Sequence, residues 1–166
     1  DALLRRRTAR EPLAYIVEYR EFYGIEIACS PAALIPRPES EMLVDLALEE
    51  AGRRSEIRIV DVGAGTGAIA VAIALNAPNA RVLATDVSDA ALALARRNVD
   101  RHGLEARVKL RKADLFDGLG AFDVIVANLP YVSEGDWRGL APELRDHEPK
   151  TALVGGETGA EIIEAM

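Results

Sequence analysis

The sequence has a single cysteine, Cys29, and only two histidines, His102 and His147. One cysteine cannot form an internal disulfide, and the two histidines lie far apart in the sequence. The chain therefore lacks the clustered Cys/His pattern of a metal site. We expect no bound metal, and we expect both histidines on the surface.

Long apolar runs and an excess of basic charge are also missing. No stretch approaches the ~20 apolar residues of a membrane-spanning helix, and there is no signal-peptide pattern. The net charge of −7 disfavours broad nucleic-acid binding, which needs a basic surface. The one basic cluster, Arg5, Arg6, Arg7 and Arg10, is typical of a solvated helix face. We expect a cytoplasmic monomer with no membrane or direct nucleic-acid partner.

What the sequence does contain is an ordinary globular balance. Of its 166 residues, 49% are hydrophobic and 28% are charged, which is enough for one domain with a sizeable core. It begins at Asp1 in what reads as a helix already under way, and Ile162–Met166 reads as the inside of another helix. This pattern predicts a piece of a longer chain.

The N-terminal third shows hairpin and proline signals. Residues 13–29 are rich in Tyr, Ile, Val and Phe around Gly24, which predicts a β-hairpin. Residues 34–41 contain two prolines, which cannot lie inside a helix. They predict a stiff extended segment that presents Arg37 and Glu39 at defined angles, with a simple rigid linker as the alternative. A helix follows, with Ser40 as N-cap and Gly52 as its end. Its predicted buried residues are Met42, Leu43, Leu46 and Ala47.

Beyond residue 56, strand and helix signals alternate. The predicted strands are Ile57–Val62, Ala80–Thr85, Ala106–Leu110, Phe122–Ala127 and Thr151–Val154. The predicted helices are Thr66–Asn76, a helix capped by Ser88 that runs to about Arg101 and is closed by Gly103, and one from Ala160 onward. This alternation predicts an α/β fold with a doubly wound, mainly parallel sheet and helices on both faces.

A glycine-rich loop joins the first of these strands to its helix. The segment runs Asp61-Val62-Gly63-Ala64-Gly65-Thr66-Gly67. Its glycines permit a tight turn and a close ligand, and the helix N-terminus offers free N–H groups. Asp86 ends the next strand, where a carboxylate can accept hydrogen bonds from both ribose hydroxyls. Together these features predict a nucleotide-containing ligand, with a plain tight turn as the alternative.

The loop alone leaves two cofactors open. With Ala68 in the last position it fits a dinucleotide fingerprint. It also fits S-adenosylmethionine, whose cationic amino-acid end Asp61 could hold, whereas that carboxylate would repel a pyrophosphate. Asp114-Leu115-Phe116 follows the third sheet strand, where an adenine edge would lie. For these residues the alternatives are capping by Asp114 and core packing by the other two.

The tetrapeptide Asn128-Leu129-Pro130-Tyr131 follows the fourth predicted strand, at the sheet edge where α/β proteins bind ligands. Asn128 can accept a hydrogen bond through its side-chain oxygen. Pro130 keeps Leu129 extended, so the Leu129 carbonyl is a second acceptor. Tyr131 adds a flat face. Together they could hold a planar group that bears an NH2, and a strand-ending turn is the alternative.

These segments together resemble the protein-(glutamine-N5) methyltransferases that act on peptide-chain release factors, the HemK-like family. The resemblance is carried by Pro12–Ile16, Glu21–Gly24, Leu34–Glu41, Asp61–Gly67, Asp86, Asp114–Phe116, Asn128–Tyr131 and Glu148-Pro149. In the family signature Asn-Pro-Pro-Tyr, Leu129 replaces the first proline, a variant also found in rRNA adenine dimethyltransferases. Glu18 stands where the family usually has glycine.

The resemblance implies methyl transfer from S-adenosylmethionine to a glutamine side-chain nitrogen in the Gly-Gly-Gln loop of a release factor, with S-adenosylhomocysteine as product. It implies a helix remnant and β-hairpin linker at residues 1–38 and a methyltransferase domain at 39–166, without the last strands or most of the N-terminal helical domain. The implied cofactor-binding residues are Asp61, Gly63, Ala64, Gly65, Thr66, Gly67, Asp86, Asp114, Leu115 and Asn128. The implied catalytic and substrate-binding residues are Asn128, Leu129, Pro130 and Tyr131, with Arg37 and Glu39 also binding substrate.

Three other functions stay open at this point. Leu129 is compatible with an RNA or DNA adenine-N6 methyltransferase, although the acidic net charge is unfavourable. The glycine loop is compatible with an NAD-dependent dehydrogenase. Two features are unfavourable to that function: the carboxylate of Asp61 and the lack of an obvious histidine for proton transfer. A non-catalytic binding module is the third.

Overall fold

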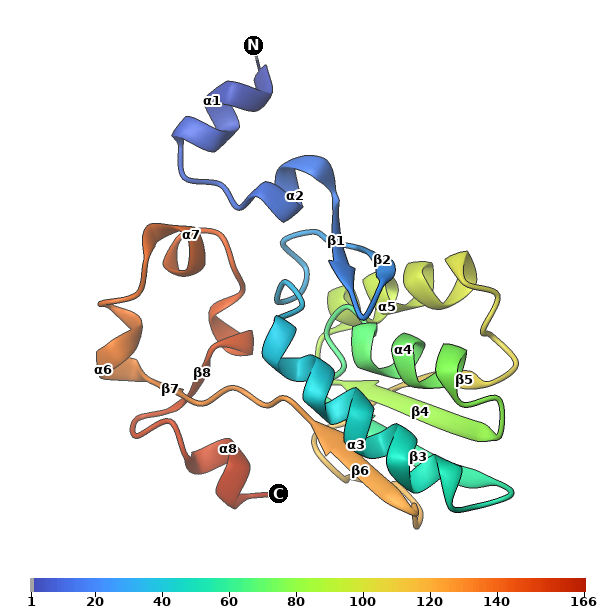
Figure 1. The fold of residues 1–166 in the computed structure, drawn as a ribbon. Helices are drawn as coiled ribbons and strands as arrows, with labels where there is room; N and C mark the ends of the chain where they lie inside the picture. The colour runs from blue at the N-terminus through green and yellow to red at the C-terminus, as the bar shows by residue number, and fades with distance from the viewer. Residues whose placement is uncertain (1) are drawn as a thin grey trace.

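The computed structural model describes residues 2–166 and is built around a four-stranded parallel sheet (Figure 1). Its strands are β3 (Ile57–Val62), β4 (Ala80–Asp86), β5 (Val108–Lys112) and β6 (Val124–Ala127), in the order β5-β4-β3-β6. All of these pairings are parallel, which confirms the predicted α/β fold. The chain moves outward from β3 to β5 and then returns to the other side of β3. Such a reversal opens a crevice at the carboxyl ends of the strands.

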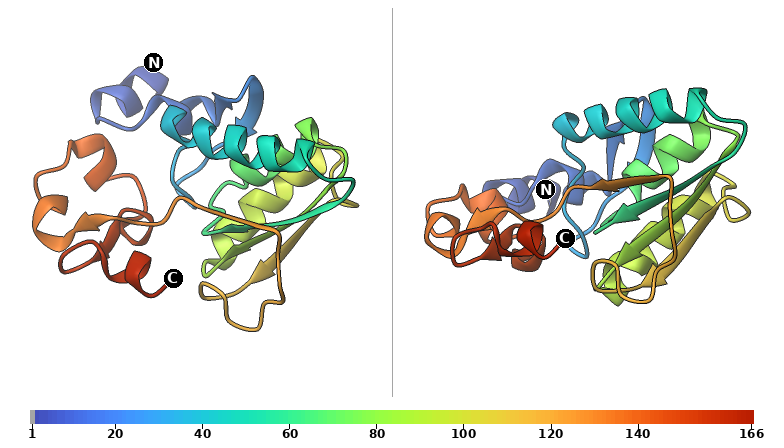
Figure 2. Two further views of the ribbon diagram at one scale, coloured as in Figure 1. Left: turned by 60° about the horizontal axis from the view of Figure 1, so that its bottom comes forward. Right: turned by 90° about the horizontal axis from the view of Figure 1, so that it is seen from below.

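Three helices, α3 (Glu41–Gly52), α4 (Ala68–Asn76) and α5 (Asp89–Arg101), pack on one face of this sheet (Figure 2). Side chains alternate across a strand, so residues such as Ile59 meet these helices in the main core. On the opposite face, Val60 and Val62 are covered mainly by the connection between β5 and β6, so the prediction of helices on both faces is wrong for the described residues. The side chains of that connection are Leu115, Phe116, Leu119 and Phe122.

The N-terminal part comprises α1 (Ala2–Thr8), α2 (Leu13–Val17) and an antiparallel hairpin of β1 (Tyr19–Phe22) and β2 (Ile25–Ala28). The predicted hairpin is therefore correct from residue 19 onward and wrong for residues 13–17, which are helical. In this turn of helix, Ala14, Tyr15 and Ile16 are buried. Burial of consecutive side chains against neighbouring segments outweighs the strand preference of Tyr and Ile.

The start of α3 also differs from the prediction. Ser40 is the last residue of a 3-10 turn, η1 (Pro38–Ser40), and its side chain forms no capping bond. The buried residues of α3 are Val44, Ala47 and Ala51, whereas Met42 and Leu46 are 64% and 56% exposed. These small residues allow α3 to pack closely on α4, so the helix is rotated from the orientation that its largest apolar residues suggested.

The C-terminal part forms a separate lobe beside the sheet (Figure 1). Its elements are β7 (Val132–Ser133), α6 (Glu134–Trp137), α7 (Pro142–Arg145), η2 (Lys150–Ala152), β8 (Val154–Gly156) and α8 (Glu161–Glu164). The strand predicted at residues 151–154 is wrong for its first three residues, because the chain there completes a 3-10 turn. Within residues 2–166, no helix has the length and apolar character needed to cross a membrane.

Candidate active site

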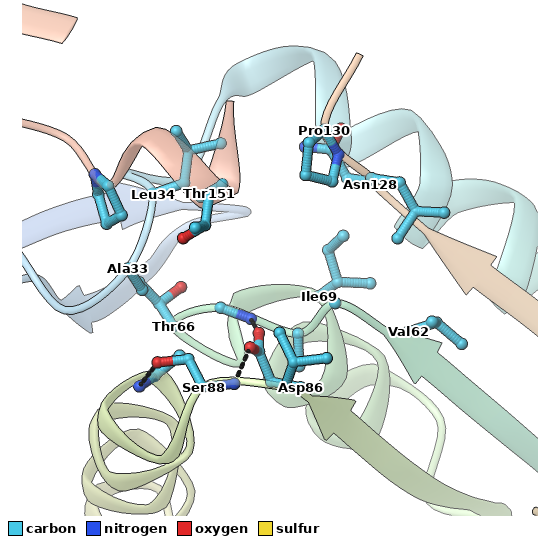
Figure 3. Close-up of a pocket in the computed structure, with 18 of the residues that line it drawn as sticks. Ala33, Leu34, Val62, Thr66, Ile69, Asp86, Ser88, Asn128, Pro130 and Thr151 are labelled. Atoms are coloured by element: carbon cyan, nitrogen blue, oxygen red, sulfur yellow. Dashed lines mark hydrogen bonds between the residues drawn. The ribbon is translucent and has the colours of Figure 1, made fainter. Parts of the chain in front are cut away.

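A pocket of about 840 Å³ opens at the carboxyl ends of the parallel strands, and Figure 3 shows its interior. The lining segments include Pro31–Arg37, Val62–Thr66, Asp86–Ser88, Ala113–Leu115 and Asn128–Pro130. Asp86 and Ser88 lie on one side of the open space, with Asn128 and Pro130 opposite them (Figure 3). A pocket of this volume accommodates a ligand of cofactor size. Most of the segments predicted from sequence therefore meet at one place.

The glycine loop forms the floor of the pocket between β3 and α4. Gly63 has φ +72° and Gly65 has φ +55°, in the left-handed region that side chains disfavour. A Cβ on Gly63 would also lie 3.2 Å from the Leu129 side chain. The loop thus presents bare backbone toward the pocket, so a ligand can approach it closely.

Asp86 is tied to this loop by its carboxylate. Its Oδ2 accepts a hydrogen bond from the Gly65 N–H at 2.9 Å, and its Oδ1 accepts one from the Ser88 N–H at 2.9 Å (Figure 3). The Ser88 hydroxyl accepts from the Ala91 N–H at 3.2 Å, which confirms Ser88 as the predicted cap of α5. Each carboxylate oxygen keeps a further lone pair. Asp86 can therefore accept additional hydrogen bonds from a ligand.

Asp61 lies behind the loop and is fully buried, and it is not among the residues that line the pocket. Its Oδ2 accepts a hydrogen bond from the Ala70 N–H of α4 at 3.2 Å, while Oδ1 has no partner among the described residues. Burial raises the pKa of this carboxyl to about 7; the Ala70 bond lowers it and the charge of Asp86 raises it. A carboxyl with one unsatisfied oxygen thus sits beneath the ligand-facing backbone.

Asn128 has a fixed orientation at the end of β6. Its Nδ2 donates to the Ser40 hydroxyl oxygen at 2.9 Å, which leaves Oδ1 as the acceptor for a ligand. The Leu129 side chain is buried against Val60 and Val62. The residue that replaces the first proline of the Asn-Pro-Pro-Tyr signature is therefore also part of the hydrophobic core. Tyr131 is 69% exposed and lies outside the pocket lining.

Two glycines of the C-terminal lobe support this tetrapeptide from behind. A Cβ on Gly155 would overlap the Pro130 carbonyl oxygen, and a Cβ on Gly159 would overlap the Tyr131 carbonyl oxygen. At both positions the backbone of the glycine contacts the backbone of the tetrapeptide directly, so a side chain there would displace the tetrapeptide.

The segment Pro31–Arg37 is held over the pocket by buried polar side chains. Arg37 donates to Glu148 Oε1 at 2.6 Å, and Glu148 Oε2 accepts from the Ile35 N–H at 3.1 Å. The Tyr15 hydroxyl donates to the Ala33 carbonyl at 2.8 Å, and burial raises the pKa of this phenol. The charge of Arg37 is thus already paired. Glu39 is exposed and does not line the pocket.

Comparison with protein families identifies the fold around this pocket. The family described as Methyltransferase small domain matches residues 39–144. The chain belongs to this methyltransferase family. The match covers the sheet, the glycine loop, Asp86 and the tetrapeptide.

Curated relatives of this methyltransferase share its sequence closely. A release factor glutamine methyltransferase of Geobacter sulfurreducens is 44% identical over 99% of this chain and 57% of its own length. The enzyme of the same name from Rhodopirellula baltica is 45% identical over 99% of this chain and 58% of its own. The chain therefore spans less than two thirds of the curated relatives it matches.

Solved structures of methyltransferases share the fold. The catalytic domain of human METTL16 in complex with a 3'UTR hairpin has a TM-score of 0.69 at 19% identity, covering 86% of this chain and 55% of that chain. The N-terminal domain of human METTL16 in complex with SAH has a TM-score of 0.56 at 24% identity, covering 68% and 49%. At these identities the likeness concerns the fold alone.

Besides Tyr15, Gly155 and Gly159, a buried residue of α5 that shapes the methyltransferase pocket was missed from the sequence. Asn98 of α5 is fully buried; its Oδ1 accepts from the Ala28 N–H at 2.8 Å, and its Nδ2 donates to the Thr66 carbonyl at 2.9 Å and to the Ala28 carbonyl at 3.1 Å. It thereby joins the hairpin to the glycine loop. Its position on the apolar stripe of α5 was an available signal, because Leu94 lies one turn before it on the same face.

Proposed function

We propose that this chain carries the methyl-transfer site of an enzyme that methylates the side-chain amide nitrogen of a glutamine in a protein, the Gly-Gly-Gln loop of a peptide-chain release factor. The observation that carries the proposal is Asn128, held by Ser40 with its side-chain oxygen available, opposite the glycine loop and Asp86. The names of the relatives at 44% and 45% identity support the substrate. The family match from residue 39 supports a linker at 1–38 and a methyltransferase domain at 39–166.

The residues of the pocket fit S-adenosylmethionine. Gly63 and Gly65 leave room for its methionine part, and Asp86 has lone pairs for both ribose hydroxyls. Leu115, half-buried beside the end of β5, offers an apolar contact for adenine, with Asp114 next to it. The unpartnered oxygen of Asp61 attracts the positive end of such a ligand through the loop. When bound, the cofactor supplies an electrophilic methyl group on a sulfonium.

The amide nitrogen of glutamine is a poor nucleophile, because its lone pair is delocalised into the carbonyl. Catalysis therefore depends on orientation and on stabilisation of the charge that develops on nitrogen. Asn128 Oδ1 and the Leu129 carbonyl oxygen accept hydrogen bonds from the two amide N–H groups and direct the nitrogen lone pair into the pocket. Transfer of the methyl would break its bond to sulfur, leaving the cofactor as a neutral thioether and the amide nitrogen positive, and the nitrogen would then lose one proton to solvent.

The remaining residues of the site act around this pair. Pro130 keeps the Leu129 carbonyl in place, and the exposed Tyr131 contacts the plane of the substrate amide from outside the pocket lining. Arg37 acts through Glu148 by fixing the segment above the pocket, since its charge is already paired. Glu39, which is exposed close to Ser40, contacts the substrate from outside the pocket.

The test uses the intact enzyme, a purified release factor, a structured RNA and labelled S-adenosylmethionine. Label is expected on the Gly-Gly-Gln glutamine by peptide mass mapping. Asn128→Ala is expected to keep the cofactor dissociation constant within a few-fold and to reduce transfer by about 100-fold or more, as for a lost transition-state contact. Label on RNA adenine alone would instead support the adenine methyltransferase that Leu129 left open.

A further inference from the structure

The solvent-facing side of α3 carries two large apolar side chains. Met42 is 64% exposed and Leu46 is 56% exposed. They lie one helical turn apart, on the side of α3 opposite the buried Val44 and Ala47. A helix that lies on a sheet usually presents polar residues to water. The exposed apolar pair is therefore a feature that packing of this fold does not explain.

Acidic side chains frame this pair. Glu39, Asp45 and Glu49 are all exposed, one turn before or after the apolar residues. The helix as a whole contains four acidic residues and no basic one. Asp45 accepts a hydrogen bond from the Tyr23 hydroxyl, and Arg53, directly after the helix, pairs with Glu49, so this surface keeps a net negative charge. A surface of this kind is complementary to apolar side chains that are flanked by lysine or arginine. It is unsuited to the phosphate backbone of a nucleic acid.

The pair lies on α3, which begins at the rim of the pocket beside Ser40; neither Met42 nor Leu46 lines the pocket itself. Ser40, whose hydroxyl holds Asn128, immediately precedes α3, and Met42 belongs to its first turn. At 1.5 Å per residue, Leu46 lies only about 9 Å along the axis from Ser40. A protein whose loop reaches Asn128 must place the body of its domain against some part of this rim.

We propose that Met42 and Leu46, framed by Glu39, Asp45 and Glu49, form a docking surface for the body of the protein substrate, which presents a basic surface with apolar side chains there. This inference rests on the proposed function and extends it. The pocket recognises the glutamine, and the α3 surface recognises the folded domain that carries it. Two linked contacts bind the folded protein more tightly than the glutamine loop alone.

The experiment compares a folded release factor with a short peptide that contains its Gly-Gly-Gln loop. In the intact enzyme, Met42→Ser with Leu46→Ser is expected to raise KM for the folded protein about 10- to 30-fold, as for two interface side chains. The kcat for the folded protein, the kcat/KM for the peptide and the cofactor affinity are expected to stay unchanged. The unchanged peptide reaction also shows that the variant is folded.

Leu75→Ser is the matched control, because Leu75 is 40% exposed near the end of α4 that points away from the pocket. It is expected to leave all of these constants unchanged. A KM for the folded protein that stays at the wild-type value in the double variant, or that rises equally for the peptide, overturns the docking surface. Wild-type enzyme that methylates no glutamine overturns the proposed function and this inference with it.

Discussion

Replacing Asp61 by asparagine is expected to change how the stability of the free protein depends on pH. In the folded state, burial raises the pKa of this carboxyl from 3.8 to about 7. Between these values the folded protein holds a proton that the unfolded chain has released, so wild-type stability falls as pH rises. The loss is about 1.4 kcal/mol per pH unit up to pH 7 and levels off above it, so it amounts to about 4 kcal/mol between pH 4 and pH 8.

The amide side chain introduced by Asp61→Asn cannot ionise, so the variant lacks this loss. The amide oxygen still accepts from the Ala70 N–H, and the new Nδ2 takes the place of Oδ1, which has no partner among the described residues of the wild-type protein either. The variant is therefore expected to have about the stability of wild type at pH 4 and to be more stable than wild type at pH 8. The difference in unfolding free energy between the two proteins should change by about 4 kcal/mol across that range.

Urea unfolding at pH 4, 5, 6, 7 and 8, followed by far-UV circular dichroism, measures this difference. Parallel pH profiles for the two proteins would refute the reasoning, because they would mean that Asp61 ionises alike in the folded and unfolded states. The same variant is expected to bind S-adenosylmethionine more weakly by calorimetry, since the carboxylate beneath the loop is lost. A gain in stability joined to a loss of affinity would identify Asp61 as a residue retained for binding.

Three other substitutions test separate parts of the structure. Asp86→Ala is expected to weaken cofactor binding by about 2–4 kcal/mol in calorimetry, because two charge-assisted hydrogen bonds are lost; an unchanged dissociation constant would contradict its role. Glu18→Gly is expected to stabilise the fold by about 1 kcal/mol in thermal unfolding, because Glu18 has φ +66° at the end of α2, and a lower Tm would count against this. Glu148→Gln is expected to cost about 3 kcal/mol in urea unfolding, since it removes the buried partner of Arg37, and a loss below about 1 kcal/mol would show that the pair does not hold the segment.

The elements that could be predicted from sequence are those with local causes. The turn at Gly63 and Gly65 and the cap at Ser88 depend on neighbouring residues, so their residue types identify them directly. The parallel strands β3 and β4 are short apolar runs between turn signals. Because their carboxyl ends meet at one edge, the proximity of Asp86 and the glycine loop followed from the order of elements.

The parts that could not be predicted depend on contacts between distant segments. Ser40 has the sequence context of a helix cap, but its hydroxyl bonds to Asn128, 88 residues later. From the sequence alone, Arg37 suggests a free cation. In the fold it pairs with Glu148, which lies 111 residues later. The orientation of α3 likewise follows from packing against α4, which the periodicity of its own largest residues does not reveal.

The glycines behind the tetrapeptide have a consequence for when the site can assemble. The carbonyls of Pro130 and Tyr131 rest on Gly155 and Gly159, and the segment above the pocket is held by Glu148. A chain emerging from the ribosome can therefore form β3, β4 and the glycine loop well before these supports exist. We therefore expect the cofactor-binding backbone to form before the substrate side of the pocket, which needs contacts from residues 148–159 that are distant in sequence.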